Sequence, residues 1–251
     1  MASVTQRIKK IKQPYGGYLP PKWFSKTFLN DDMILSDGEN ISADLVATAV
    51  DYLTRFMLGS DVREAFHVSI LGAIRNKMLE KALDLISIIS GLDDNSIIAA
   101  CKLVGFDVCY RASISKYEPI EKIFPNKITI ENIRIMVKRS CCFFEQYGPV
   151  THVSPVFTGG YTKTVNAGDG DFTTRDTLWD FKILRAQITS NYTLQILMYY
   201  IMGLHSKYAY FKEITKLGFY NPRLNIVYTI PVSAIPDTTI KEIEKSVICY
   251  D

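Results

Sequence analysis

Apolar residues in the first half of the chain recur at the three- and four-residue spacing of amphipathic helices. The first such run extends from Leu45 to Phe56, follows Ser42 and stops before Gly59. Serine is a common helix cap and glycine a common helix end, so the run predicts a helix that begins at Ala43.

Further helices are predicted downstream by the same spacing. Asp61 opens a second helix that extends to about Leu79, and Asp94 or Asn95 caps a later one. Residues 107–112 fit either a short strand or a frayed helical end. The pattern therefore favours a mainly helical layer in this part of the chain.

The pattern changes near residue 128. Thr129 is expected to cap a helix over Ile130–Tyr147, and Gly148 with Pro149 ends it. Val150–Val156 then alternates in the manner of a strand. Strand, hairpin, helix, strand and helix patterns follow, which predicts an α/β core.

The end of the chain predicts two strands joined by a turn at 221–225, then a short helix from Thr239 to about Ile248. Arg223 and Asn225 in the turn either reach a phosphate or cap the turn. Together these patterns divide the chain into an extended basic strap over 1–41, a helical layer or subdomain over 42–127, and a core over 128–251.

The strap is rich in proline and glycine, which favours short extended pieces over a long helix. Trp23, Phe24 and Phe28 are expected to pin it to the rest of the protein. All basic residues of the strap precede the first acidic residue, Asp31; they are Arg7, Lys9, Lys10, Lys12, Lys22 and Lys26. Such an arm either contacts a phosphate backbone or is a solvated terminal segment.

Composition excludes several classes of protein. Hydrophobic residues make up 47% of the 251 residues and charged residues 22%, which is ordinary for a globular protein, and the net charge is only +3. The five cysteines form no C-x-x-C pair, so free, buried thiols in a reducing compartment are expected. No apolar run is long enough to span a membrane and no secretory leader is visible. A cytoplasmic protein without a membrane partner is predicted.

The chemistry concentrates in a predicted hairpin. Asp171 and Asp180 lie nine residues apart, and Asp180 and Lys182 share a strand face because they are two residues apart. If residues 173–176 form the turn, the two carboxylates face each other and could bind Mg²⁺ or Mn²⁺, with the backbone carbonyl of Phe181 as a further ligand. Lys182 could orient or deprotonate water, or stabilise charge on a phosphate. The alternative is a surface ladder of Asp and Lys.

A second pair of polar residues follows at helical spacing. Gln195 and Tyr199 are four residues apart, so their side chains lie on one face of a predicted helix. Alone, the pair is equally compatible with ordinary amphipathic packing.

The order Gly168-x-x-Asp171, Asp180-x-Lys182, Gln195-x-x-x-Tyr199 resembles the PD-(D/E)xK nuclease superfamily, most closely its RecB-like branch, over roughly residues 128–230. The resemblance implies a restriction-endonuclease-like mixed sheet flanked by helices. It also implies Asp171 and Asp180 as metal ligands, Lys182 as the catalytic lysine, and Gln195 and Tyr199 shaping the catalytic site or contacting nucleic acid.

Other features of that family have weaker counterparts. Glu145 is the candidate for a metal-facing glutamate on the preceding helix, and Asp169 for a neighbour of, or substitute for, Asp171. His67 is the only upstream helical histidine. Cys249 stands alone near the C-terminus, so no iron–sulfur cluster is expected.

The sequence thus predicts a hydrolase: a Mg²⁺- or Mn²⁺-dependent nuclease that cleaves phosphodiester bonds, with DNA as the expected substrate. Lys163, Arg175 and Arg185 are further candidates for phosphate contacts. The alternative is a non-catalytic nucleic-acid-binding or assembly subunit that keeps the nuclease fold. A protein partner or a homo-oligomer is compatible with both.

Overall fold

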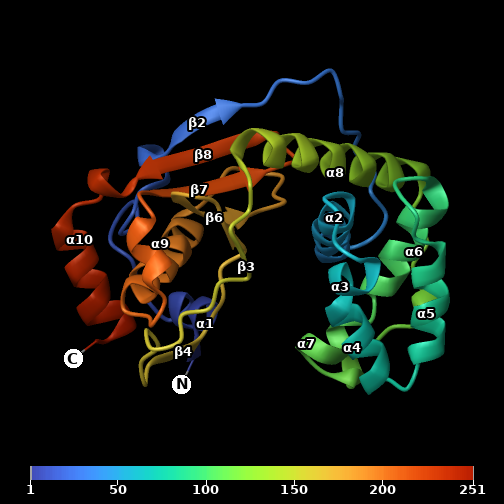
Figure 1. Cartoon of the computed structure of the whole chain (residues 1–251), viewed down its shortest axis with the longest axis horizontal. Coiled ribbons are helices and arrows are strands. Elements are labelled where there is room, and N and C mark those ends of the chain that lie inside the picture. The colour runs from blue at the N-terminus through green and yellow to red at the C-terminus, as the bar shows by residue number, and fades with distance from the viewer. Residues whose placement is uncertain (1, 251) are drawn as a thin grey trace. The chain divides into compact units, whose positions relative to one another are not determined.

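The computed structural model describes residues 2–250 and divides into two compact units. The first, here called the sheet unit, contains the chain up to Asn30 and from Phe144 onward. The second, the helical unit, is Asp31–Phe143. The strap up to Asn30 therefore belongs to the same unit as the predicted core, and the long helix α8 (Lys127–Tyr147) is shared between the two units (Figure 1).

The sheet unit is built on a mixed six-stranded sheet flanked by helices, which confirms the predicted α/β class. Within this six-stranded sheet, only β6 and β7 run parallel, and every other neighbouring pair is antiparallel. Its strands, in spatial order, are β2 (Ser25–Phe28), β8 (Ile226–Pro231), β7 (Lys216–Asn221), β6 (Thr177–Phe181), β5 (Phe172–Thr173) and β3 (His152–Val153).

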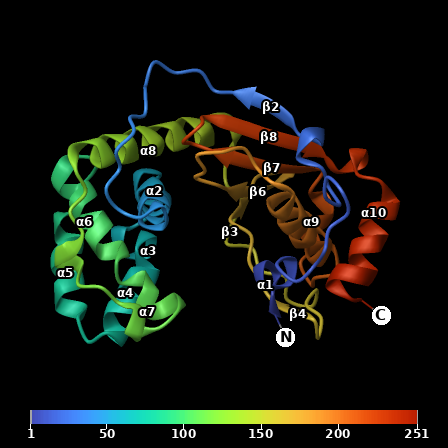
Figure 2. The same ribbon diagram turned by 180° about the vertical axis from the view of Figure 1, so that it is seen from behind.

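The helix α9 (Ser190–Leu204) covers one face of this sheet, as both ribbon views show (Figures 1 and 2). Leu178 of β6 and Phe219 of β7 share one hydrophobic core with most of α9. Side chains alternate between the faces of a strand, so Asp180 lies on the face that carries Leu178. A charged residue thus stands on the covered face of the sheet.

The opposite face of β6 carries Trp179. Its ring packs against Phe172 of β5 and Tyr147 of α8, and its Nε1 donates a 3.0 Å hydrogen bond to Thr174. Gly218 of β7 pairs with Trp179 in register. These contacts fix the indole ring over the glycine.

The strap folds onto the sheet unit through short elements. α1 (Val4–Ile8) begins with a capping box between Ser3 and Gln6, and β1 (Ala2–Ser3) pairs in parallel with β4 (Val165–Ala167). Phe24 is buried against Phe219, as expected. The same expectation for Trp23 and Phe28 is wrong, because 42% and 62% of their surfaces are exposed.

The helical unit contains α2 and the helices that follow it up to most of α8. Ser42 caps α2 through a hydrogen bond from Leu45 N, as predicted. The bounds of the helices before α8 are α2 (Ala43–Met57), α3 (Val62–Ala65), α4 (His67–Arg75), α5 (Leu79–Ile88), α6 (Asp94–Val104) and α7 (Asp107–Arg111).

Three details of the helical prediction are wrong. The helix expected from Asp61 to Leu79 breaks at Phe66, which ends α3 and precedes α4. Asp93, not Asp94 or Asn95, caps α6, because its carboxylate accepts hydrogen bonds from the backbone amides of Asn95 and Ser96. α8 begins at Lys127 and not at Ile130, since Asn126 accepts the hydrogen bond from Thr129 N.

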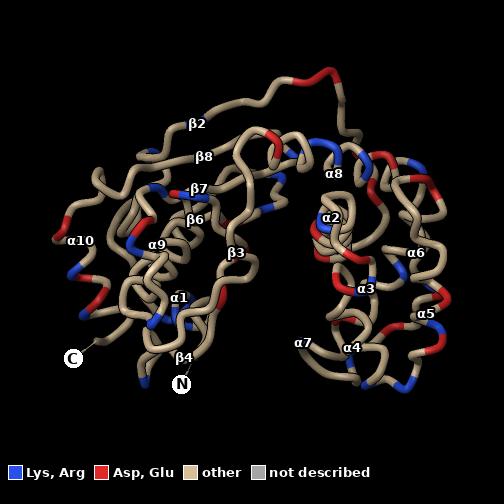
Figure 3. Tube along the Cα trace, in the orientation of Figure 1, with Lys and Arg blue, Asp and Glu red and all other residues tan. Residues whose placement is uncertain are grey.

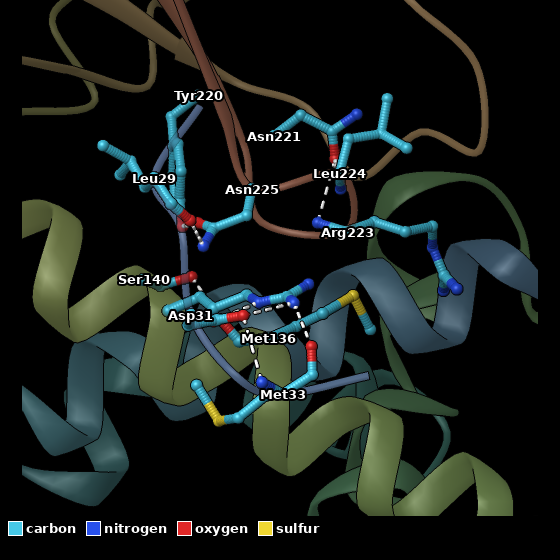
Figure 4. Close-up of polar contacts among 11 residues, drawn as sticks. Leu29, Asp31, Met33, Met136, Ser140, Tyr220, Asn221, Arg223, Leu224 and Asn225 are labelled. Atoms are coloured by element: carbon cyan, nitrogen blue, oxygen red, sulfur yellow. Dashed lines mark hydrogen bonds and ion pairs between the residues drawn. The ribbon is translucent and has the colours of Figure 1, made fainter. Parts of the chain in front are cut away.

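The segment 107–112, left open between strand and helix, is helical up to Arg111 and forms α7. Asp31 and Met33 begin the helical unit, and both contact Arg139 of α8. Figure 4 shows the Asp31 carboxylate and the Met33 carbonyl turned toward the same guanidinium. The hydrogen bonds from Arg139, together with its charge, hold the pKa of Asp31 below its usual value, although burial opposes the shift.

The C-terminal helix begins earlier than predicted. α10 (Asp237–Glu242) starts two residues before Thr239 and continues as a π-helical segment, Ile243–Ile248. Residues 237–248 carry both acidic and basic side chains (Figure 3). Within residues 2–250, no helix is both long and apolar enough to cross a membrane.

The packing of Trp179 on Gly218 generates a testable prediction. A Cβ at residue 218 would lie 2.4 Å from two atoms of the indole ring, whereas a Cβ at Gly91 meets nothing within 4 Å. We expect Gly218→Ala to lower the free energy of unfolding by about 1–3 kcal/mol, since the fixed ring cannot yield. Gly91→Ala is the control, and urea unfolding curves of both variants provide the measurement. Equal stability of the two variants would contradict the packing argument.

Candidate active site

The predicted hairpin is present and brings the two aspartates to opposite strands. β5 and β6 pair Phe172 with Trp179 and Thr173 with Leu178. One further step along this antiparallel register sets Asp171 opposite Asp180. The turn between the strands is closed by a 3.0 Å hydrogen bond from Thr174 N to the Thr177 carbonyl.

The carboxylate of Asp171 turns toward the end of β6. Its Oδ2 accepts a 2.6 Å hydrogen bond from Phe181 N, and its backbone carbonyl accepts one from Ser154 N. Asp171 is half-buried. The side chain therefore holds the end of the hairpin together and lies beside the backbone that follows Asp180.

Asp180 and Lys182 form a buried ion pair. Lys182 Nζ lies 2.6 Å from Asp180 Oδ2, and the side chains are 19% and 3% exposed, respectively. Within residues 2–250, this ion pair is the only polar interaction of that buried oxygen. The two side chains share the covered sheet face, as the sequence spacing predicts.

Burial determines the electrostatics of the pair. Removal from water raises the pKa of Asp180, and the charge of Lys182 opposes this rise. Burial also acts to lower the pKa of Lys182, but the charges of Asp180 and Asp171 outweigh it, so that pKa is raised. Lys182 is therefore held as an ammonium group.

Gln195 and Tyr199 meet on one face of α9, the helix that covers the sheet. Gln195 Nε2 donates a 2.9 Å hydrogen bond to the Tyr199 hydroxyl, and both residues are buried. Burial raises the pKa of Tyr199, and the charges of Asp180, Asp171 and Asp169 raise it further. The hydroxyl thus stays protonated among the acidic groups, and its own proton remains available to an acceptor.

Gly168 has a structural role beside Tyr199. Its φ of +155° is unusual for other residues, and a Cβ there would lie 2.9 Å from Val4 and 3.3 Å from the Tyr199 ring. Tyr161 fixes this turn by donating a 2.8 Å hydrogen bond to the Gly168 carbonyl. The glycine of the Gly-x-x-Asp spacing therefore lets the chain pass close to Tyr199.

The two additional acidic candidates, Glu145 and Asp169, are more exposed than Asp171 and Asp180. Glu145 is exposed near the end of α8. Asp169 is exposed and forms an isolated bridge with Val156, although its charge reaches Tyr199. Asp171 is thus the better placed of the two hairpin candidates.

The three histidines lie in other surroundings. His67 is exposed at the start of α4, in the helical unit. His152 stacks on Tyr210, and His205 contacts Glu244 at 2.9 Å. None of these contacts involves the aspartates of the hairpin.

Two residues that the sequence did not single out contact Lys182 or the segment that follows it. Tyr192, in the first turn of α9, places its ring 5.4 Å from Lys182 Nζ, a cation–π contact. Asn221 is fully buried at the end of β7; its amide donates to the Leu184 carbonyl, and its Oδ1 accepts from Arg223 N. Only the three-dimensional pairing of β6 with β7 reveals this tie, because Leu184 and Asn221 are far apart in sequence.

At the turn that follows Asn221, the side chain of Asn225 forms hydrogen bonds within the protein. Asn225, at a left-handed φ of 52°, accepts a hydrogen bond from Tyr220 and donates one to the Leu29 carbonyl. Figure 4 shows these side chains clustered at the turn, with Arg223 directed away from them. The Asn225 side chain thus contacts Tyr220 and Leu29, and the turn amides of Arg223 and Leu224 donate to Asn221 instead.

The donor set at the hairpin fits a hard divalent cation. Mg²⁺ in proteins is commonly held by one or two carboxylates together with phosphate or water oxygens. Asp180 supplies a buried carboxylate oxygen whose only polar partner in residues 2–250 is Lys182, and Asp171 supplies a second carboxylate beside Phe181. Within the same residues, no group of three or more His, Cys, Asp or Glu side chains is arranged to hold a metal ion. Two protein carboxylates are thus the available set.

The thiols are distributed differently from the expectation. Cys101 and Cys109 are buried, whereas Cys142 is exposed on α8 and Cys249 is half-buried. Burial raises the pKa of the Cys101 thiol to about 12, which keeps it protonated. The cysteines therefore include both core and surface residues.

Comparison with known proteins identifies no relative: no family model, no curated protein and no solved structure matches this chain.

The Asp180–Lys182 pair generates a prediction about stability. We expect Lys182→Met to lower the free energy of unfolding by about 3–5 kcal/mol at neutral pH, since a buried carboxylate loses its counter-charge. Without Lys182, burial still keeps the pKa of Asp180 raised in the folded state, so above the ordinary carboxyl pKa the unfolded chain ionises more readily than the folded protein. The loss is therefore absent below the ordinary carboxyl pKa, grows as pH rises from that value to the raised one, and is constant above it. Urea unfolding across this pH range measures both effects.

The double variant Asp180→Asn/Lys182→Met is the control for this experiment. It removes both charges, so most of the lost stability should return and its pH dependence should be weak. A double variant as unstable as Lys182→Met would show that the loss comes from packing and not from an unpaired carboxylate.

Proposed function

We propose that this protein is a metal-dependent nuclease with a restriction-endonuclease-like sheet unit of the PD-(D/E)xK type. The observation that supports this most directly is the hairpin register. It sets Asp171 opposite Asp180, with Lys182 on the same face as Asp180, and the charges of both aspartates act on Tyr199 of α9, which Gln195 contacts. The reaction is hydrolysis of a phosphodiester bond, with DNA as the proposed substrate.

Asp171 and Asp180 would hold Mg²⁺ or Mn²⁺, with the Phe181 carbonyl as a further ligand. A bound cation of this kind polarises a phosphate and makes water easier to deprotonate. Of the roles considered for Lys182, its raised pKa favours stabilising negative charge on the phosphate over accepting a proton. The protonated Tyr199 hydroxyl, oriented by Gln195, can donate a hydrogen bond to a phosphate oxygen.

Only some of the basic side chains of the strap are free of hydrogen bonds and ion pairs within residues 2–250 and available to a nucleic-acid substrate. Arg7 is used inside the protein, because its guanidinium donates to the carbonyls of Val247 and Ser246. Lys9, Lys10 and Lys12 are exposed in the same unit as the hairpin. These three lysines and the exposed Lys22 are the part of the arm that remains available for phosphate contacts, whereas Lys26 donates a hydrogen bond to Gln187.

A non-catalytic role is the second candidate, and one observation favours it. The two aspartates already have partners within the protein, since Asp180 pairs with Lys182 and Asp171 accepts the Phe181 amide. The same contacts would be expected in a hairpin whose charged residues stabilise the fold and take no part in catalysis. Cleavage assays separate the two candidates.

For the catalytic proposal, we expect cleavage of linear or plasmid DNA with Mg²⁺ or Mn²⁺ and none with EDTA. Asp180→Asn, Asp171→Asn and Lys182→Ala should each reduce the rate at least about 100-fold, because each removes a charge from the reacting site. The measurement is the initial rate of cleavage on a gel. Circular dichroism of each variant verifies that it is folded.

The same hairpin offers a matched control. Asp176 lies in its turn and pairs with Lys216 at 3.0 Å, and both side chains are substantially exposed. Asp176→Asn and Lys216→Ala repeat the chemical changes away from the site and should cleave at nearly the wild-type rate. Equal rates in the site variants and these controls would refute the catalytic assignment, and binding without cleavage would favour the non-catalytic role.

Metal binding can be measured apart from cleavage. We expect titration calorimetry with Mn²⁺ to show one site in the wild-type protein that is lost in Asp171→Asn and in Asp180→Asn, because each removes a proposed carboxylate ligand. Asp176→Asn should bind like the wild type. Unchanged Mn²⁺ affinity in the two site variants would place the cation elsewhere.

A further inference from the structure

The helical unit contains a second site that the proposed nuclease chemistry does not use. A cleft of about 560 Å³ lies between the start of α2, the end of α6, α7 and the connector that follows α7. Binding sites for small molecules commonly have volumes of about 300–1,000 Å³. We propose that this cleft binds a small organic anion with an apolar body.

A buried polar network forms one wall of the cleft. Asp107 is only 7% exposed; it accepts hydrogen bonds from the Tyr52 hydroxyl at 2.7 Å and from Ser69 at 2.5 Å. Arg111 Nε contacts the same carboxylate at 3.3 Å, and Arg111 Nη2 donates to Tyr52 at 3.1 Å. The Asp107 carboxylate is thus bound by groups of the protein itself, and the Nε–Nη2 edge of the Arg111 guanidinium is held by Asp107 and Tyr52.

The other edge of Arg111 is open. Its side chain is 61% exposed, and within residues 2–250 its Nη1 donates no hydrogen bond. The network raises the pKa of Arg111, although burial opposes the rise, so the guanidinium is always charged. A planar guanidinium held on one edge is preorganised to bind an oxyanion on the other, since little side-chain freedom remains to be lost.

The rest of the lining defines the two parts of the ligand. Leu45, Val104 and Val108 provide apolar surface, and Lys116 and Lys122 add two exposed cations. Two exposed carboxylates, Asp44 and Glu118, also line the cleft. Asp44 lies in the first turn of α2, where a negative charge complements the helix end. An anionic group at Arg111 with an apolar body on the valines is the ligand that this lining fits.

Phenyl phosphate is the probe, with benzyl alcohol as its uncharged counterpart, both titrated by calorimetry against the full chain in EDTA. We expect phenyl phosphate to bind saturably and benzyl alcohol at least about tenfold more weakly. Arg111→Ala should raise the Kd for phenyl phosphate at least about tenfold, because charge-assisted hydrogen bonds are lost. Arg63→Ala removes an exposed arginine of the same unit and should leave the Kd unchanged.

A second variant keeps the test independent of folding, since Arg111→Ala also unpairs a buried carboxylate. Lys116→Glu/Lys122→Glu changes only exposed side chains and should likewise weaken phenyl phosphate binding. Lys216→Ala, which changes an exposed lysine of the sheet unit, should not affect it. No saturable binding to the wild type, equal binding of benzyl alcohol, or an unchanged Kd in both Arg111→Ala and the double lysine variant would overturn the proposal.

Discussion

The placement of one carboxylate, that of Asp180, on the covered face of a sheet constrains the rest of the sheet unit. A charge there is tolerated only with a counter-charge, and Lys182 supplies it two residues later on the same face. The local sequence thus provides the ion pair, but its burial comes from α9, which is distant in sequence. The hairpin and α9 must be assembled together for either charge to be stable.

Several contacts then fix the geometry around this pair. Asp171 ties the hairpin to the end of β6 through the Phe181 amide, and Asn221 of β7 ties the segment after Lys182 to the neighbouring turn. Gly168 lets the preceding chain pass close to Tyr199. Each tie uses a backbone group, so the side chains of the pair are held by the fold and not by a network of their own.

The sequence predicts the parts that depend on local rules. The hairpin at Asp171 and Asp180 and the α9 face of Gln195 and Tyr199 follow from periods of two and 3.6 residues, and both are observed. Details that depend on competition between neighbours were missed. Several residues near Asp93 can cap α6, and the spacing does not decide which of them does.

The sequence also did not fully predict which side chains become exposed or buried through contacts between distant parts of the chain. The exposure of Phe28 follows from its place on the edge strand β2, which no local pattern reveals. The role of Asn221 depends on the parallel pairing of β6 with β7, and the network at Asp107 on the packing of α7 against Tyr52 and Ser69. Tertiary structure decides which polar residues become buried, and a buried polar group must then find partners.

The two carboxylates that are buried within residues 2–250 show how the choice of cation changes what an ion pair can do. Asp107 is paired with an arginine, whose fork can hold the carboxylate on one edge and present its other edge to solvent. Asp180 is paired with a lysine, whose ammonium is a compact charge on a flexible stem and is enclosed beside the acid. The first arrangement leaves its carboxylate with three hydrogen-bond donors and frees part of the cation. The second leaves one buried carboxylate oxygen with a single partner, which a divalent cation could replace.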